Sequence, residues 1–432
     1  MHTQTSGKRS GGRSYSSGGP RVRKFRSGPR RGGSSGNGGK PSQGQGRGGR
    51  SGRGGGNRFG GGRKKSTLDV SSFINKAVTA TETVAYFVPD NAFSDFVIDK
   101  QIKDTLVTRG YEHPTPIQDK AIPHVLRGDD VVGLANTGTG KTAAFLIPII
   151  NKILHDKKQQ VIILAPTREL AIQIEDELKL FASKLGIHSV VCVGGMRIGL
   201  QIQKLRNYNH FIIGTPGRTI DLIKRGHLKL SNVKTVVLDE ADRMLVMGFI
   251  NDIKYILKEI PKERQTLCFS ATLAPEIKKL INDFLIEPVT ISVKTQDMPT
   301  SIEQDIVRVE GRDKTAMLAE FLHQHDFKKV LVFGRTKHGV GKLSEELNKK
   351  GLKTESIHGN KSHSQRQSAL KKFKENRITA LIATDVAARG LDITNISHVI
   401  NFDIPETYDD YVHRIGRTGR GASKGKALTF IG

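Results

Sequence analysis

The stretch "DDVVGLANTGTGKTAAFLIPII", residues 129–150, decides the fold because it contains three kinds of local structure in succession. "DVVGLA" (130–135) is a short β-branched and apolar run, which is typical of a buried strand. A Gly-rich segment follows and interrupts regular structure. The apolar "KTAAFLIPII" (141–150) then favours a helix. A strand, a loop and a helix in this order predict one βα unit of a parallel sheet.

Units of the same kind recur along the chain and predict an α/β fold. The pattern restarts after a polar stretch with a proline, residues 295–304. Two tandem doubly wound domains, each with a buried parallel sheet, are the simplest account. The predicted strands lie in 161–166, 189–195, 211–216, 235–240 and 266–272, then in 330–336, 353–359, 380–385, 398–403 and 426–431. The predicted division is a tail 1–65, a linker 66–92, a first domain 93–294, an interdomain linker 295–304 and a second domain 305–432.

The tail has a composition of its own. Residues 1–65 hold 17 Lys or Arg, no Asp or Glu, and 22 of the 47 glycines. The rest of the chain has 52 Lys or Arg against 42 Asp or Glu, so the tail supplies 17 of the 27 net positive charges. Such a segment cannot bury enough apolar surface to fold, and we expect it to be disordered. Its "RGG" repeats favour loose RNA binding over a merely solubilising role.

The cysteines and the hydropathy pattern indicate a reducing compartment. Cys192 and Cys268 lie in separate apolar runs, so we expect two buried thiols rather than a disulfide or a metal pair. No apolar run approaches the ~18 residues of a membrane span, and no secretory signal peptide is visible at the N-terminus. A cytoplasmic protein that does not enter the membrane is the expectation.

The Gly-rich loop Ala135–Thr142, "ANTGTGKT", matches the P-loop pattern G-x4-G-K-[ST] except for its first residue. Gly138 and Gly140 allow the backbone N–H groups to face phosphate oxygens, and the following helix adds its dipole. Lys141 would reach the β and γ phosphates, and Thr142 would ligate Mg²⁺. The alternative is a plain Gly-rich turn, but the flanking strand and helix favour nucleotide binding.

A second motif is "VVLDEADRML" (236–245), an apolar run that ends in three carboxylates. Buried carboxylates are costly unless they are paired or bind a cation. A strand that ends in Asp-Glu beside a P-loop resembles the Walker B element. Asp239 would hold Mg²⁺ through its water shell, and Glu240 would activate the attacking water as general base. A surface turn is the alternative.

The ordered set of motifs resembles a known family. The chain contains "GYEHPTPIQ" (110–118), "PTRELA" (166–171), "GG" (194–195), "TPGR" (215–218), "SAT" (270–272), "VFGRT" (332–336), "TDVAARGLD" (384–392) and "HRIGRTGR" (413–420). With the P-loop and "DEAD" (239–242), these resemble the DEAD-box ATP-dependent RNA helicases, and the wording is similar to the bacterial RhlE kind. The resemblance spans about residues 83–432 and implies two tandem RecA-like domains.

The resemblance also implies roles at the ATP site. Gln118 would pair with adenine, and the isolated aromatic Phe93 would stack on it unless it is an ordinary core residue. Asp242 would link either to His413 or to Ser270 and Thr272. Arg417 and Arg420, with His413 and Arg414 in the same turn, would bring arginine fingers from the second domain. The full set of implied ATP contacts is Phe93, Tyr111, Gln118, Ala135, Asn136, Thr137, Gly138, Thr139, Gly140, Lys141, Thr142 and Asp392.

By the same resemblance, RNA would lie across both domains. Small residues would admit backbone amides to the phosphates, arginines would supply charge, and little base readout is expected. The implied contacts are Thr167, Arg168, Gly194, Gly195, Thr215, Pro216, Gly217, Arg218, Arg335, Thr336, Thr384 and Arg389.

Two departures from the family pattern stand out. Asn136 replaces a common Gln in the P-loop, which should be mild. Where the family has Q-x-x-R, this chain has Gln365 followed by Ser368, so we expect an arginine to be missing, with Arg366 as a partial substitute. The sequence stops at Gly432 just after the last predicted strand, so we expect targeting to depend on the tail or on a partner.

The sequence therefore predicts an ATP- and Mg²⁺-dependent RNA helicase. RNA-stimulated hydrolysis would drive closure of a cleft and local, nonprocessive separation of short duplexes. The alternatives are an ATP-gated RNA clamp or annealing chaperone with little unwinding, and a DNA-translocating helicase. A monomer is expected, and partners in ribosome assembly or RNA decay are both compatible with the family.

Overall fold

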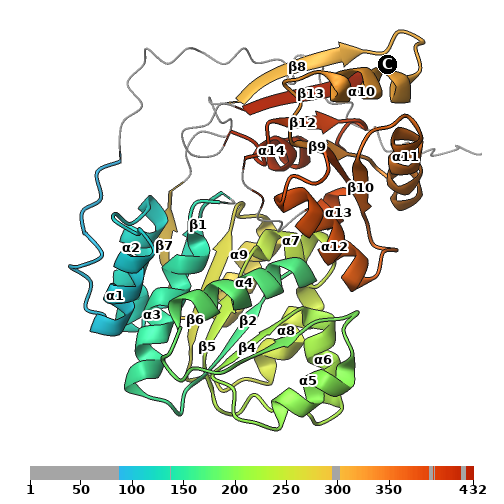
Figure 1. Cartoon of the computed structure of the whole chain (residues 1–432). Helices are drawn as coiled ribbons and strands as arrows, with labels where there is room; N and C mark the ends of the chain where they lie inside the picture. Colours follow the sequence, from blue (N-terminus) through green and yellow to red (C-terminus); the bar gives the residue numbers. More distant parts are fainter. Residues whose placement is uncertain (1–86, 137, 294–301, 389–392, 394, 420–424) are drawn as a thin grey trace, which may run out of the picture. The chain divides into compact units, whose positions relative to one another are not determined.

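A computed structural model describes residues 87–136, 138–293, 302–388, 393, 395–419 and 425–432. These residues belong to one unit of the chain, residues 65–432. They form two α/β domains in sequence (Figure 1), so the predicted fold class is confirmed. The predicted tail 1–65 lies outside the described residues. Among the described residues, no helix is long and apolar enough to span a membrane.

The first domain is built on a sheet that has seven parallel strands among the described residues (Figure 1). From one edge to the other, the strands are β3 (Ser189–Cys192), β4 (Phe211–Gly214), β2 (Gln160–Leu164), β5 (Val233–Leu238), β6 (Gln265–Ser270), β1 (Val131–Leu134) and β7 (Val289–Ser292). Parallel neighbours require crossover connections, and helices supply them. The helices are α1 (Lys100–Thr108), α2 (Pro116–Arg127), α3 (Lys141–His155), α4 (Arg168–Phe181), α5 (Ile198–Leu205), α6 (Pro216–Lys224), α7 (Ala241–Val246), α8 (Ile250–Lys258) and α9 (Pro275–Phe284).

Each face of the first sheet is covered by an apolar layer. Successive side chains of a strand point to opposite faces, so Val161 and Ile163 of β2 join one buried cluster and Ile162 and Leu164 join the other. The first cluster includes residues of α1 to α4, and the second includes residues of α6 to α9. Cys192 and Cys268 lie buried in the second cluster as free thiols, which confirms that expectation.

The second domain repeats the design on a smaller sheet (Figure 1). Its six described strands are parallel, in the order β10 (Thr354–Ile357), β11 (Ala380–Ala383), β9 (Val330–Phe333), β12 (His398–Asn401), β13 (Gly425–Ile431) and β8 (Ile302–Arg308). Strand β9 again alternates between two buried clusters along its length. The helices are α10 (Lys314–His323), α11 (Lys337–Lys349), α12 (His363–Lys374), α13 (Asp385–Ala388) and α14 (Tyr408–Ile415).

The predicted boundary of the second domain needs a correction. Strand β8 begins at Ile302, inside the range 295–304 that was predicted as linker, and pairs with β13. The sequence did not predict β8 because it is an edge strand in which only alternate residues are buried at its start. Ile302 and Gln304 face inward, and the buried Gln304 accepts a hydrogen bond of 2.9 Å from the hydroxyl of Tyr411.

Strand register brings the motifs of the first domain to one edge of its sheet. Leu134 pairs with Ser270, Leu164 pairs with Leu238, and Leu238 pairs with Cys268. Strands β1, β2, β5 and β6 therefore end side by side. Ligands of open α/β sheets bind at the carboxyl ends of the strands, so this edge is where a site is expected.

Candidate nucleotide and nucleic-acid site

The Gly-rich loop connects β1 to α3 in the form that the sequence predicts. Gly138 and Gly140 adopt the left-handed φ values of 86° and 90°, which glycine accepts readily. Lys141 begins α3 and is buried. Its ammonium donates a hydrogen bond of 2.9 Å to the carbonyl oxygen of Ala135. The predicted phosphate-binding lysine therefore already has an acceptor on the loop itself. Thr137 lies outside the described residues.

Gln118 contacts the Gly-rich loop from α2. Its Nε2 donates to the carbonyl oxygen of Gly140 at 3.1 Å, and its Oε1 accepts from the backbone N–H of Thr115 at 3.0 Å. The hydroxyl of Thr115 donates to the carbonyl oxygen of Thr139 at 2.8 Å. The segment predicted to read adenine is thus joined to the phosphate loop by two hydrogen bonds. Adenine pairing by Gln118 stays a prediction.

Phe93, predicted to stack on adenine, lies beside Tyr111, which was predicted among the ATP contacts. Phe93 is 5% exposed and belongs to the core cluster, where its ring meets Phe96 and Tyr111 edge to face. Tyr111 is 37% exposed. Tyr111 is therefore more exposed than Phe93, and stacking of Phe93 on adenine stays a prediction.

The carboxylates at the end of β5 are buried. Asp239 lies beside Glu240, whose backbone N–H donates to the Asp239 carboxylate at 3.0 Å. Burial raises the pKa of Asp239 to about 6, although the charge of Lys141 opposes that rise. Burial would also raise the pKa of Glu240, but the charges of Arg243, Lys141 and Arg417 hold it below its ordinary value. The site thus holds an ionised Glu240 among cations.

Asp242 joins this motif to the "SAT" segment. Its Oδ2 accepts hydrogen bonds from the backbone N–H groups of Ala271 and Thr272 and from the hydroxyl of Thr272, at 3.0 to 3.2 Å. The hydroxyl of Ser270 donates to the carbonyl oxygen of Thr272 at 2.7 Å. Of the two links expected for Asp242, the structure therefore contains the one to this segment.

Two described arginines of the second domain have different surroundings: Arg414 pairs with Asp385, and the charge of Arg417 acts on Glu240. Arg414 is buried and donates to both carboxylate oxygens of Asp385, at 2.6 and 2.8 Å, so it anchors α14 to α13. Arg417 is buried, and its charge is among those that lower the pKa of Glu240. His413 is half-buried. Asp392 and Arg420 lie outside the described residues.

Most of the residues predicted to contact RNA sit at helix N-termini or against glycines. Thr167 and Thr336 cap α4 and α11 with their hydroxyls, and Thr215 precedes Pro216 at the start of α6. Such N-termini favour phosphate. The guanidinium of Arg168 lies against the backbone of Gly194 and Gly195, where a side chain would collide with it.

The remaining residues predicted to contact RNA have separate surroundings. Arg218 is paired weakly with Asp221, at 3.6 Å. Arg335 is exposed, and its backbone N–H donates to Asp403 at 2.7 Å. Gly217 is exposed and Thr384 precedes α13. Arg389 lies outside the described residues.

The structure shows where Ser368 and Arg366 lie, and the loss of an arginine at Ser368 stays a prediction. Ser368 is exposed on α12, whereas Arg366 is buried and its Nη2 donates to Glu169 of "PTREL" at 2.6 Å. Helix α12 begins at His363 with Ser362 as its cap, and this start sets which residues face inward. Sequence reasoning did not identify Glu169 as the partner of Arg366.

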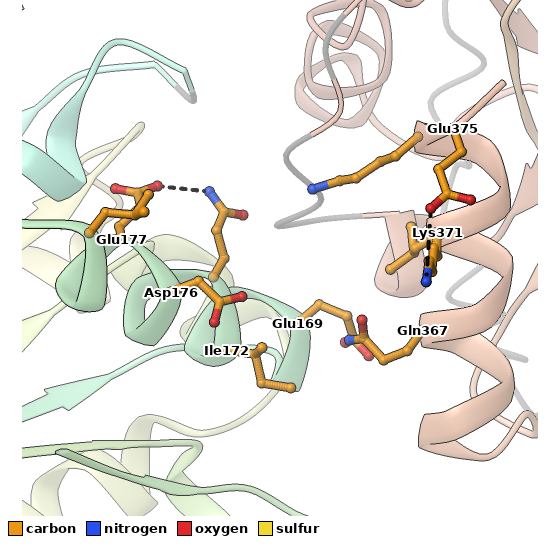
Figure 2. Close-up of a pocket in the computed structure, with 11 residues that line it drawn as sticks. Glu169, Ile172, Asp176, Glu177, Gln367, Lys371 and Glu375 are labelled. Atoms are coloured by element: carbon orange, nitrogen blue, oxygen red, sulfur yellow. Dashed lines mark hydrogen bonds and ion pairs between the residues drawn. The ribbon is translucent and has the colours of Figure 1, made fainter. Parts of the chain in front are cut away.

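A separate cavity of about 480 Å³ lies between α4 and α12. Figure 2 shows its acidic wall, with Glu169, Asp176 and Glu177 on α4, and its second wall, with Gln367 and Lys371 on α12. None of the residues that line it was predicted to contact ATP or RNA.

Family models match both domains. A DEAD/DEAH box helicase model matches residues 115–280, and a helicase conserved C-terminal domain model matches residues 313–422. An ATP-dependent RNA helicase CshA of Listeria monocytogenes is 48% identical over 343 residues, which are 78% of this chain and 66% of that protein. A DEAD-box ATP-dependent RNA helicase CshA of Geobacillus kaustophilus is 47% identical over 341 residues, which are 78% of this chain and 73% of that protein. The chain belongs to the DEAD-box helicase family.

A solved structure supports the fold of this DEAD-box protein. Dbp5 of Saccharomyces cerevisiae, bound to RNA and ADP BeF3, is 30% identical with a TM-score of 0.71, over 79% of this chain and 89% of that chain. Both domains are therefore RecA-like. The chain spans just under two thirds of the length of several CshA relatives, 64% to 66%. The finer likeness to the RhlE kind stays an expectation.

Proposed function

We propose that this DEAD-box protein is an ATP-dependent RNA helicase that couples RNA-stimulated ATP hydrolysis to local, nonprocessive separation of short duplexes. The observation that carries the proposal is the buried group of Lys141, Asp239 and Glu240, in which the charge of Arg417, from the second domain, also acts on Glu240. A hydrolytic site that depends on two domains can be switched by whatever brings those domains together.

In this proposal the residues of the first domain bind and orient ATP. Lys141 exchanges the carbonyl oxygen of Ala135 for the β and γ phosphates. Gln118 pairs with adenine, Phe93 stacks on it, and Tyr111 packs against Phe93. Glu240 accepts a proton from the attacking water, and Arg417 stabilises charge that develops at the γ-phosphate.

The donor set fits Mg²⁺. No cluster of three or more His, Cys, Asp or Glu side chains that could hold a metal exists in the described part of the chain. Mg²⁺ does not require one, since it is usually held by one or two carboxylates, phosphates and waters. Thr142 and Asp239 would hold it here, and when bound it would neutralise phosphate charge.

RNA would bind along helix N-termini and the glycine pair under Arg168. Contacts of this kind reach phosphates and 2′-hydroxyl groups rather than base edges, so little sequence preference is expected. A DEAD-box protein of this kind would work in the cytoplasm as a monomer, in ribosome assembly or RNA decay. The reducing environment expected for two free thiols supports the cytoplasm.

Steady-state ATPase assays test this function. Turnover is measured without nucleic acid, with single-stranded RNA and with DNA of the same sequence, and separation of a short labelled RNA duplex is followed in parallel. Strong stimulation by RNA, and duplex separation that needs ATP and is lost in Lys141→Ala, would support a helicase. ATP-dependent RNA binding without separation would indicate a clamp or annealing chaperone. Equal stimulation by DNA would indicate a DNA-directed enzyme.

A further inference from the structure

Arg243 is a buried cation that the ATP-site assignments above leave without a role. It lies in α7 immediately after "DEAD" and is 3% exposed. Its Nη1 donates a hydrogen bond of 2.7 Å to Oε2 of Glu240. Its Nη2 is buried and has no hydrogen-bond partner among the described residues.

This arrangement is poor as a purely structural device. Buried guanidinium groups normally satisfy most of their donors, and a donor left unpaired in the interior lowers stability. An apolar side chain of similar length would fill the same volume without that loss. Among the described residues, the side chain that accepts a hydrogen bond from this guanidinium is Glu240, so its role is sought there.

The backbone and the side chain of Glu240 are both constrained. The backbone has φ 51° and ψ 52°, a left-handed conformation that is uncommon outside glycine. Strained backbone conformations are common at functional sites, where the surrounding structure enforces them. Within the described residues, the side-chain hydrogen bond to the Glu240 carboxylate comes from Arg243. That bond occupies Oε2 and leaves Oε1 for another partner.

We propose that Arg243 is a positioning residue for ATP hydrolysis, which fixes the Glu240 carboxylate so that Oε1 faces the attacking water. The inference rests on the proposed function, since it requires Glu240 to be the general base. Arg243 does not touch the nucleotide in this scheme. Its removal should therefore lower kcat and leave the KM for ATP nearly unchanged.

A double-mutant cycle tests this role. RNA-stimulated kcat and KM are measured for the full chain and for Arg243→Gln, Arg243→Lys, Glu240→Gln and the double variant Glu240→Gln with Arg243→Gln. Arg312→Gln serves as the matched control, because Arg312 is exposed and pairs with Glu320 at 3.0 Å, far along the chain from this site. Slow variants are followed by single-turnover hydrolysis.

Arg243→Gln should lower kcat roughly tenfold, a fraction of the 10²–10⁴-fold that a general base contributes. The KM for ATP should stay within about twofold, and Arg243→Lys should recover most of kcat because it restores one charged donor. With Glu240→Gln already present, Arg243→Gln should have no further effect, since residues that act as one unit are not additive. Arg312→Gln should match the wild type.

Three results would overturn the proposal. One is wild-type kcat for Arg243→Gln while Glu240→Gln stalls. Another is an equal loss from Arg243→Gln in both backgrounds, which would mean that Arg243 does not act through Glu240. The third is a loss from Arg312→Gln as large as that from Arg243→Gln. If Glu240→Gln itself turned over like the wild type, the general base would be wrong, which is a separate failure of the proposed function.

Folding of each variant is checked by its thermal midpoint before the kinetics. If Arg243→Gln does not fold, Arg243→Lys and Arg243→Met replace it in the cycle. A folded Arg243→Met with wild-type kcat would overturn the proposal as clearly as the Gln variant.

Discussion

The carboxylate of Glu240, the proposed general base, is held in place by its surroundings. It is buried, its backbone is held left-handed, and nearby cations keep its pKa below the ordinary value. A low pKa keeps the group ionised and able to accept a proton from water near neutral pH. The same burial makes the neighbouring Asp239 sensitive to any loss of positive charge from Lys141.

Replacing Glu240 separates binding from chemistry. Glu240→Gln keeps the size and the hydrogen-bonding capacity of the side chain but removes the proton acceptor. We expect ATP and RNA binding to be retained, while hydrolysis slows by roughly 10²-fold or more. Single-turnover hydrolysis and equilibrium RNA binding in the presence of ATP measure the two effects. Wild-type turnover by this variant would remove Glu240 as the base.

His398 predicts how acid affects the second domain. Its ring stacks on Phe327 with centroids 3.9 Å apart, and burial lowers its pKa to about 4. The unfolded chain therefore binds this proton from about pH 6.5 downward while the folded chain does not, so stability is complete above pH 6.5 and falls as pH drops toward 4. The expected loss between pH 7 and pH 5 is about 2 kcal/mol, at about 1.4 kcal/mol per pKa unit.

Urea unfolding of wild type and His398→Phe at pH 7 and pH 5 measures this effect. The variant keeps an aromatic stack but carries no titrating group. Its free energy of unfolding should therefore fall by about 2 kcal/mol less than that of the wild type between pH 7 and pH 5. His325→Phe, at an exposed position, is the control and should keep the wild-type pH dependence. An identical loss in His398→Phe and in wild type would contradict the prediction.

At the scale of elements, β1 depends on a glycine for its packing. Gly133 pairs with Phe269 of β6, and a Cβ there would stand 2.5 and 2.6 Å from two ring carbons. We expect Gly133→Ala to destabilise the first domain by about 1–3 kcal/mol, the usual result of overpacking a core. Thermal or urea unfolding measures it, with Gly199→Ala in open space on α5 as the control. Equal stability of the two variants would show that β6 can move aside.

Strands with a continuous apolar run were predictable from the sequence. Features that depend on contacts with distant parts of the chain were not. "VIILAP" and "VLVFGRT" are continuous apolar runs, and they form β2 and β9 because both of their faces are buried. Strand β8 was missed because an edge strand buries only alternate residues. Strand order was not predictable, since it depends on crossovers between distant residues.

The site divides in the same way. The loop at Lys141 and the carboxylates of 239–242 were visible as short motifs with fixed spacing. Glu169 and Arg366 are 197 positions apart, so only the fold brings them together. The contact of Gln118 with the carbonyl oxygen of Gly140 was hidden for the same reason, because a backbone acceptor leaves no mark in the sequence.

At the scale of the whole molecule, the charge distribution suggests a division of work. Residues 1–65 supply 17 of the 27 net positive charges, whereas the residues proposed to act on ATP lie outside that segment. Contacts between a basic segment and phosphates release counterions and weaken steeply with salt. A tail of this kind would raise the local concentration of RNA without changing the chemistry of hydrolysis.

Removal of residues 1–65 tests this division. We expect RNA affinity at low salt to fall roughly tenfold or more, and the salt dependence to become shallower. The kcat for ATP at saturating RNA should change less than about twofold, since the tail contributes no group to the proposed ATP site. Titration of labelled RNA at two salt concentrations, with ATPase at saturating RNA, measures both. Unchanged affinity at low salt would leave the tail as a solubilising segment.

The burial of the two cysteines has a practical consequence. Burial raises the pKa of both thiols to about 12, so the folded first domain presents almost no thiolate to an alkylating reagent. Alkylation of Cys192 or Cys268 then requires a local opening of the buried cluster that contains both residues. The alkylation rate of Cys192 and Cys268 therefore measures how often the first domain opens locally. A slower rate in the presence of ATP and RNA would show that these ligands stabilise the closed form of that domain.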